Sequence, residues 1–157
     1  MLSPEALMKV AIKQARIGMD EGQSPFGCAI AINGKIVAAA HNEVLAHTDI
    51  TAHAEIQTIR QACQHQKSIF LTGAQVATTC EPCPMCMAAL HWARVETVFY
   101  GASIMDAQKA GFNELAVPAA QLLEIGCSDV RLISSNSQHC CKQLFTDWQQ
   151  RVGNQAY

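Results

Sequence analysis

Three residues of the chain have the types and the spacing of a metal site. Cys83 and Cys86 are three residues apart, so on a helix they would lie about one turn apart on one face. Two thiolates placed in this way can bind one zinc ion, with the imidazole of His53 as a third ligand. Three protein ligands leave the fourth zinc position open for water, which is typical of a catalytic zinc. The spacing therefore predicts one zinc ion per subunit, bound by His53, Cys83 and Cys86.

Glu55 follows His53 by two residues, and its carboxylate could move protons beside this metal. In the middle of a helix the two side chains would point about 200° apart. Both can face the metal only if they stand in the first turn of a helix. The carboxylate could then take a proton from the metal-bound water and deliver it to the substrate. Glu55 is therefore the predicted catalytic residue.

The segments His53-Ala54-Glu55 and Pro82-Cys83-Pro84-Met85-Cys86 together match the signature of zinc-dependent deaminases. The chemistry expected from it is attack of zinc-bound hydroxide on an aminated ring carbon, followed by release of ammonia. Cys80 has the spacing for a fourth ligand, which would make a closed structural zinc. We expect Cys80 to be a small buried residue instead. The intact H-x-E motif also favours an enzyme over a non-catalytic zinc-binding scaffold.

Alternating strand and helix patterns surround these motifs. They predict an α/β fold, a three-layer α/β/α sandwich around a mixed five-stranded sheet, formed by one domain over residues 1–157. Asn33-Gly34 is a strong hairpin signal between the first two strands. The strands are expected at 28–32, 36–40, 76–79, 97–101 and 130–133, the helices at 4–22, 53–64, 82–93, 118–125 and 138–151, and a polar loop at 41–51.

The charge of the chain argues against a nucleic-acid partner. Its formal net charge is −2, and its 11 lysines and arginines are scattered without a run. Proteins that grip a long nucleic acid usually present a basic face, because neutralising phosphates supplies much of the affinity. We therefore expect a small-molecule substrate.

The cysteine content indicates a reducing compartment. The chain has eight cysteines but no pattern of a secretory leader. No stretch approaches the ~20 apolar residues that span a membrane. We therefore expect a cytoplasmic protein without a membrane segment, in which clustered cysteines bind metal rather than form disulfides.

With these residues identified, the chain resembles the cytidine deaminase-like superfamily nearly end to end, and within it the bacterial guanine deaminases. The superfamily motifs are Pro25-Phe26-Gly27, Asn42, Thr51-Ala52-His53-Ala54-Glu55 and Cys80-Glu81-Pro82-Cys83-Pro84-Met85-Cys86. The segments similar to guanine deaminases are Trp92-Ala93-Arg94, Asp106 to Phe112, and the tail ending in Tyr157.

This resemblance implies a set of substrate-binding residues. Asn42 would hydrogen-bond a purine, Phe26 would wall its ring, and the backbone around Ala54 would help to hold the base. Where the family usually has a pair of aspartates, of which the second binds and protonates the base, this chain has Asn113-Glu114. Glu114 keeps the carboxylate but adds a methylene. From position alone Asn42 could be a turn residue, Phe26 a core residue and Glu114 a solvated loop charge.

The resemblance also implies a homodimer. The C-terminal segment, about residues 138–157, would be swapped to the partner subunit, where Tyr157 would close the active site. The expected reaction is deamination of guanine to xanthine and ammonia, with Glu55 as the proton shuttle. The alternatives are a tRNA adenosine deaminase, which makes inosine, and a deaminase of another base or nucleoside such as cytosine, cytidine or guanosine. The last helix has mixed charges (Lys142, Asp147, Arg151), which disfavours the tRNA reading.

Overall fold

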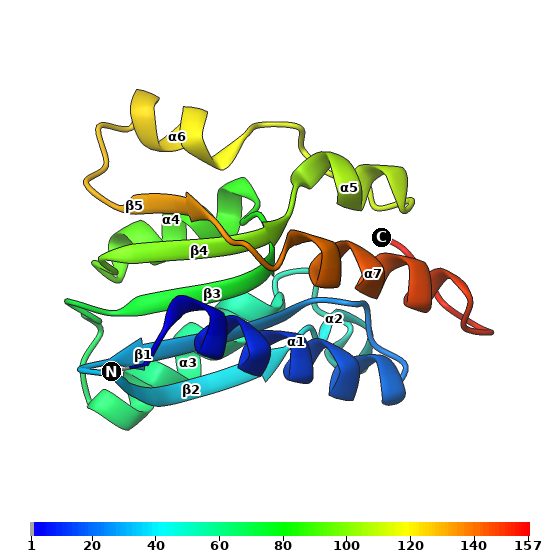
Figure 1. Cartoon of the computed structure of the whole chain (residues 1–157), viewed down its shortest axis with the longest axis horizontal. Helices are drawn as coiled ribbons and strands as arrows, with labels where there is room; N and C mark the ends of the chain where they lie inside the picture. Colours follow the sequence, from blue (N-terminus) through cyan, green and yellow to red (C-terminus); the bar gives the residue numbers. More distant parts are fainter. Residues whose placement is uncertain (1) are drawn as a thin grey trace.

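The five strands form one mixed sheet in the order β2-β1-β3-β4-β5 (Figure 1). The computed structural model describes residues 2–157. β1 is antiparallel to both β2 and β3, whereas β3, β4 and β5 run parallel. The strands are β1 (Gly27–Ile32), β2 (Lys35–His41), β3 (Gln75–Cys80), β4 (Thr97–Ala102) and β5 (Arg131–Ser134). The predicted mixed five-stranded sheet is confirmed.

Helices cover both faces of the sheet, which confirms the predicted three-layer α/β/α sandwich (Figure 1). The helices on one face are α1 (Pro4–Asp20), α5 (Ile104–Lys109) and α7 (Gln138–Gln149). Those on the other face are α3 (Ala54–Gln66), α4 (Pro84–Trp92) and α6 (Ala119–Ile125). The one-turn helix α2 (Val44–His47) follows β2.

Each face of the sheet has its own apolar core, because side chains alternate along a strand. In β1, Ala29 packs in the core under α1, whereas Ile30 packs in the core under α3.

A glycine lets α1 lie directly against the sheet. A Cβ added to Gly27 would stand 2.0 Å from the carbonyl oxygen of Ala11, so any larger residue would push the helix away.

Helix α4 begins two residues later than the sequence predicts. The expected start is Pro82, but the structure starts the helix at Pro84 with Cys83 as the N-cap. Both prolines suit a first helical turn, because each lacks the N–H that would go unpaired there. The consequence is that Cys83 lies at the mouth of the helix and Cys86 lies in its first turn.

Two short helices differ from the sequence prediction. Helix α2 interrupts the expected loop 41–51, since the side chains of Asn42 and Gln23 accept hydrogen bonds from the backbone N–H groups of Val44 and Ala46. Helix α5 lies where no helix is expected. It begins with a capping box in which Ser103 and Asp106 each accept a hydrogen bond from the other's backbone N–H.

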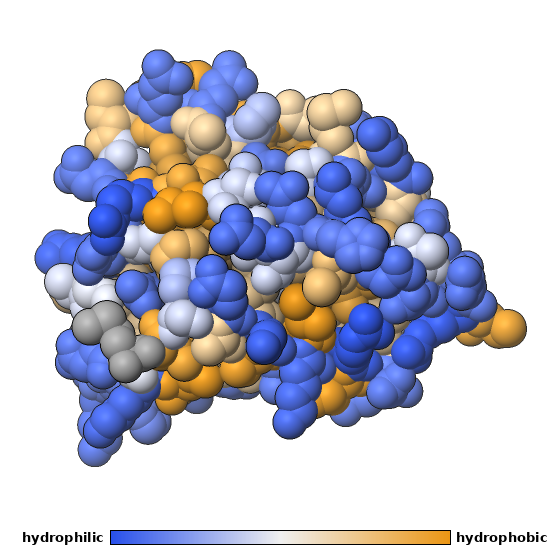
Figure 2. Space-filling model, viewed as in Figure 1, coloured by the Kyte–Doolittle hydropathy of each residue, from blue (hydrophilic) through white to orange (hydrophobic). Residues whose placement is uncertain are grey.

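The face formed by α1 and α7 is mostly hydrophilic, with apolar clusters between the charged groups (Figure 2). This pattern is typical of amphipathic helices that bury one side against a sheet. Within residues 2–157, none of the helices combines the length and the apolar character needed to cross a bilayer.

Candidate metal centre and active site

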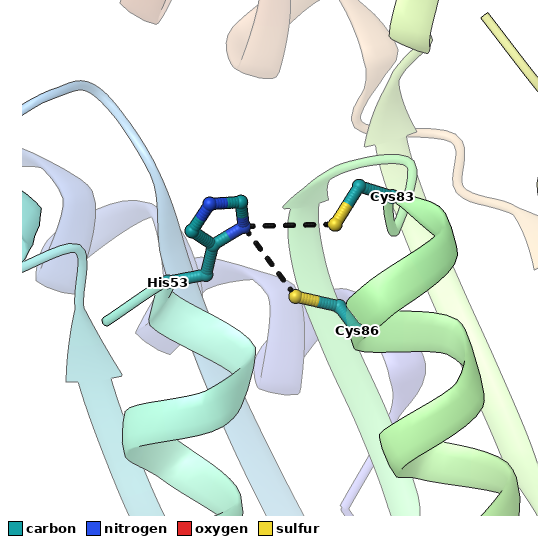
Figure 3. Close-up of side chains that lie close together, drawn as sticks. All are labelled: His53, Cys83 and Cys86. Carbon is teal, nitrogen blue, oxygen red and sulfur yellow. Dashed lines mark hydrogen bonds between the residues drawn. The ribbon is translucent and has the colours of Figure 1, made fainter. Parts of the chain in front are cut away.

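The three predicted metal ligands come together at the starts of two helices. His53 is the N-cap of α3 and Cys83 is the N-cap of α4, with Cys86 one turn further on. The Nδ1 atom of His53 lies 3.6 Å from the sulfur of Cys83 and 3.5 Å from that of Cys86 (Figure 3). A tetrahedral zinc with ordinary Zn–N and Zn–S bonds would hold such nitrogen and sulfur ligands about 3.6 Å apart. The donor set and its spacing therefore fit zinc.

The helix starts also favour the charged form of a thiol. The first N–H groups of a helix are unpaired and carry partial positive charge, which stabilises a nearby thiolate. The hydrogen bond from the Cys86 thiol, followed by that with His53, lowers the pKa of Cys83 to about 4 against the effect of burial. The same hydrogen bond to Cys83, together with burial, raises the pKa of Cys86. Cys83 is therefore the sulfur that favours the thiolate form, whereas Cys86 would lose its proton when the metal binds.

Glu55 shares the first turn of α3 with the metal ligand His53, as the spacing requires. Its carboxylate is buried, and the Thr78 hydroxyl donates a hydrogen bond to Oε1 at 2.8 Å. The other oxygen, Oε2, lies 3.5 Å from the sulfur of Cys86. Burial raises the pKa of Glu55, and the negative charge of Cys83 adds to this shift. The structure therefore places a buried carboxyl group of raised proton affinity beside the metal ligands.

Ala54, which lies between His53 and Glu55, is fully buried and packs into the core under α3. Its side chain does not line the pocket beside the metal ligands. The role predicted for its backbone in holding a base stays a prediction.

A pocket of about 340 Å³, counting its open mouth, adjoins the metal ligands. It contains Phe26, Asn42, Glu114 and Tyr157, the four side chains predicted to bind substrate. The complete lining is Phe26, Asn42, His53, Glu55, Cys80, Glu81, Cys83, Glu114 and Tyr157.

Asn42 and Tyr157 both line this pocket and contact each other there. Asn42 is fully buried, and its amide nitrogen donates to the Tyr157 hydroxyl at 2.5 Å. The carbonyl oxygen of Tyr157 accepts a hydrogen bond from the backbone N–H of Asn113 at 2.8 Å. The Tyr157 ring centroid lies 5.9 Å from that of His53. In this single chain the tail therefore covers the chain's own site, and its exchange with a partner stays a prediction.

Phe26 belongs both to the pocket and to an aromatic cluster behind it. Its ring packs edge-on against Phe112 at 4.9 Å and against Phe145 at 5.7 Å between centroids. Phe112 in turn contacts Trp148 and Tyr157. The cluster connects α7 and the tail to the wall of the pocket, so Phe26 combines the two roles considered from the sequence.

Cys80 is buried at the end of β3 and lines the pocket. Its thiol donates to the carbonyl oxygen of Ser103, and burial raises its pKa. Among the described residues, the cluster of possible metal ligands contains His53, Cys83 and Cys86 without Cys80. Cys80 is thus the buried residue that the sequence predicts.

Glu81 is a pocket residue that the sequence analysis does not single out. One carboxylate oxygen accepts a hydrogen bond from the N–H of Ile104 at 3.0 Å, and the other from the N–H of Ala119 at 2.8 Å. These two residues begin α5 and α6, and Glu114 lies on the segment between them. A single carboxylate therefore fixes both ends of the segment that brings Glu114 to the pocket.

Replacing Glu81 with glutamine should loosen this segment. The glutamine NH2 group would face a backbone N–H, leaving one buried donor without an acceptor, which costs about 1–3 kcal/mol. We expect a lower melting temperature and a KM that rises more than kcat falls, measured by thermal unfolding and steady-state kinetics. Glu124→Gln, on the exposed side of α6, is the matched control. Equal effects of the two substitutions would contradict the proposed role of Glu81.

Comparisons with known proteins agree with this site. Residues 1–102 match the family model of the cytidine and deoxycytidylate deaminase zinc-binding region. A guanine deaminase of Bacillus subtilis is 41% identical over 114 residues, covering 72% of this chain and 73% of the relative. A tRNA-specific adenosine deaminase of the same organism is 37% identical over 137 residues, covering 81% and 85%. The solved structure of guanine deaminase from B. subtilis superposes with a TM-score of 0.70 at 33% identity, covering 99% of both chains. The chain therefore belongs to the cytidine and deoxycytidylate deaminase family and is a zinc-binding hydrolytic deaminase.

Proposed function

We propose that the protein converts guanine and water to xanthine and ammonia. The observation that carries this proposal is the position of Tyr157 in the wall of the pocket, in contact with Asn42 and close to the ring of His53. A pocket with this tyrosine in its wall suits a free base, because the ring leaves less room for a ribose or a longer nucleic acid. The identity to a guanine deaminase supports the same substrate.

Two polar side chains of the pocket are suited to a purine ring. Asn42 holds its amide with Oδ1 on the N–H of Val44, which directs the NH2 group into the pocket as a donor. Glu114 is partly buried, and burial followed by the charge of Cys83 raises its pKa. A carboxyl group of raised pKa can donate a proton to a ring nitrogen as well as accept one. We assign Asn42 to a ring acceptor and Glu114 to a ring N–H or nitrogen.

The chemical step relies on Glu55. When zinc is bound, it lowers the pKa of a coordinated water. Glu55 accepts the first proton of the attacking water and passes it to the ring nitrogen. It then takes the second proton from the new hydroxyl group on the ring carbon and gives it to the leaving amine, so that a carbonyl group and ammonia are formed. Its burial supports this work, since a charge interaction is stronger where water is excluded. His53, Cys83 and Cys86 would hold the metal while Asn42 and Phe26 hold the ring.

The proposal is tested by ammonia release from a panel of substrates. The panel consists of guanine, adenine, cytosine, guanosine, cytidine and an adenosine-containing tRNA anticodon stem-loop, each run beside a Glu55→Ala control. Turnover of guanine, lost in the control, is the expected result. Turnover of a different member with inert guanine would overturn the substrate assignment while leaving the deaminase chemistry intact.

The second candidate is a tRNA adenosine deaminase, which the 37% identity to such an enzyme favours. The charges of α7 and of Arg151, two residues after it, favour guanine as the substrate. Arg151 pairs with Asp20, Lys142 lies 3.9 Å from Asp106, and Asp147 pairs with Arg16. The basic groups in this region are thus balanced by acids and offer little to phosphates. Turnover of the stem-loop in the panel would establish the second candidate.

We further expect a homodimer in which residues 138–157 exchange between subunits. The exchanged segment would make the contacts in the partner that it makes in the single chain, where α7 packs on β4 and Tyr157 on Asn42. The test mixes a Glu55→Ala chain with a Tyr157→Ala chain, after confirming that each variant alone is impaired. With exchange, the mixed dimer regains one complete site and activity rises. Without exchange, no site contains both groups and activity stays low.

A further inference from the structure

We propose that Thr78 is a positioning residue that holds the Glu55 carboxylate for proton transfer. The inference rests on the proposed function, because it requires Glu55 to be the proton shuttle. Thr78 lies on β3, and its hydroxyl donates to Oε1 of Glu55 at 2.8 Å. It would not touch the substrate, and it would act only through Glu55.

The contact fixes which carboxylate oxygen faces the metal ligands. With Oε1 held by Thr78, Oε2 is the oxygen that lies 3.5 Å from the Cys86 sulfur. Among the described residues, Thr78 is the side chain whose hydroxyl donates a hydrogen bond to this carboxylate. Without the hydroxyl, the Glu55 side chain would be free to turn among its rotamers.

The Thr78 hydroxyl has two acceptors within reach. The carbonyl oxygen of Cys80 lies 3.1 Å from the hydroxyl oxygen, and Oε1 of Glu55 lies 2.8 Å from it. A hydroxyl has one proton to donate. The nearer acceptor is the Glu55 carboxylate, so the hydroxyl is placed to hold this side chain.

The apolar packing around Thr78 would also accommodate a side chain that lacks the hydroxyl. Val76, two residues earlier on the same face of β3, packs into the core under α3 and α4. Valine has nearly the same volume as threonine, so it would fill position 78 equally well. Thr79 points to the other face, where its hydroxyl accepts a hydrogen bond from the N–H of Gly27. The two threonines are 2% exposed each, which makes Thr79 a matched control.

The experiment compares Thr78→Val, Thr78→Ser and Thr79→Val in the zinc-loaded enzyme. Because a hydrogen bond to a charged group is worth more than a neutral one, we expect kcat of Thr78→Val to fall about tenfold or more. KM and zinc content should stay near those of the native enzyme. Thr78→Ser keeps the hydroxyl and should restore most of kcat. Thr79→Val should lower the melting temperature without lowering kcat.

Crystal structures of the variants give a readout that is independent of turnover. We expect more than one orientation of the Glu55 carboxylate in Thr78→Val and a single orientation in Thr78→Ser. If Thr78→Val does not fold, Thr78→Ala removes the same hydroxyl without adding a methyl group. An unchanged kcat in Thr78→Val, or an equal loss in Thr78→Ser or Thr79→Val, would overturn the inference.

The kinetics use whichever panel substrate the native enzyme turns over fastest. If that substrate is not guanine, the substrate assignment fails, but the role of Thr78 is still tested, because every candidate reaction needs the same proton transfers. A failure of the inference and a failure of the proposed function therefore give different results.

Discussion

Replacing Glu55 with glutamine or alanine should lower kcat by about 10²–10⁴-fold, the usual contribution of a positioned proton-transfer group. The buried carboxylate lies beside Cys86 and is the residue placed to move protons there. Glutamine is the more informative variant, because its amide oxygen can still accept the hydrogen bond from Thr78 while no proton can be shuttled. The measurement is ammonia release under saturating substrate, together with the zinc content of each variant.

This loss should come without a loss of stability. A buried carboxyl group with a raised pKa is held in an unfavourable environment, so an uncharged amide of the same shape should not lower the melting temperature. Glu124→Gln, at an exposed position, serves as the control. A Glu55→Gln enzyme that keeps full zinc and more than about a tenth of the native kcat would refute the assigned role of Glu55.

Loss of the metal should have the second large effect. Cys83→Ser, or removal of zinc with a chelator, should abolish turnover and lower the melting temperature. A metal that binds only the folded chain adds its binding energy to the stability of the fold. The ligands stand at the starts of two helices 30 residues apart in sequence, so the unfolded chain does not present this set. Zinc content and thermal unfolding, with and without chelator, measure both effects.

The affinity for zinc should weaken as the pH falls. The pKa of Cys86 is raised by its bond to Cys83 and by burial, so this thiol keeps its proton until the metal displaces it. Protons and zinc therefore compete for the same sulfur, and more protons mean weaker binding. Calorimetry in buffers of different ionisation enthalpy counts the protons released. Cys140→Ser, at an exposed cysteine, should leave zinc binding unchanged. Full zinc retention by Cys83→Ser would contradict the assigned site.

The zinc centre was predictable because each half of it is a short motif, H-x-E in one segment and P-C-x-x-C in the other. The spacing of His53 and Glu55 requires a first turn, and the structure has one there. The Asn33-Gly34 hairpin and the alternation of strands with helices are also local signals, and they predict the three-layer α/β/α sandwich.

The parts that could not be predicted depend on contacts between distant segments. Glu81 binds the starts of α5 and α6, which lie 23 and 38 residues away. Thr78 reaches Glu55 across 23 residues, and α2 depends on the side chain of Gln23. The capping box of Ser103 and Asp106 is an exception, since its spacing is visible in the sequence and predicts the start of α5.

Four side chains of the pocket wall come from different segments than the hydrolytic centre. The metal ligands and Glu55 stand on the first turns of α3 and α4, whereas Phe26, Asn42, Glu114 and Tyr157 come from four other places in the chain. Mutations in those four places can reshape the pocket while the hydrolytic centre stays intact. An enzyme with this architecture could therefore change its substrate specificity gradually during evolution while it keeps its deaminase activity. Such an evolutionary history would produce relatives with different substrates. A guanine deaminase and a tRNA-specific adenosine deaminase, 41% and 37% identical to this chain, fit that expectation.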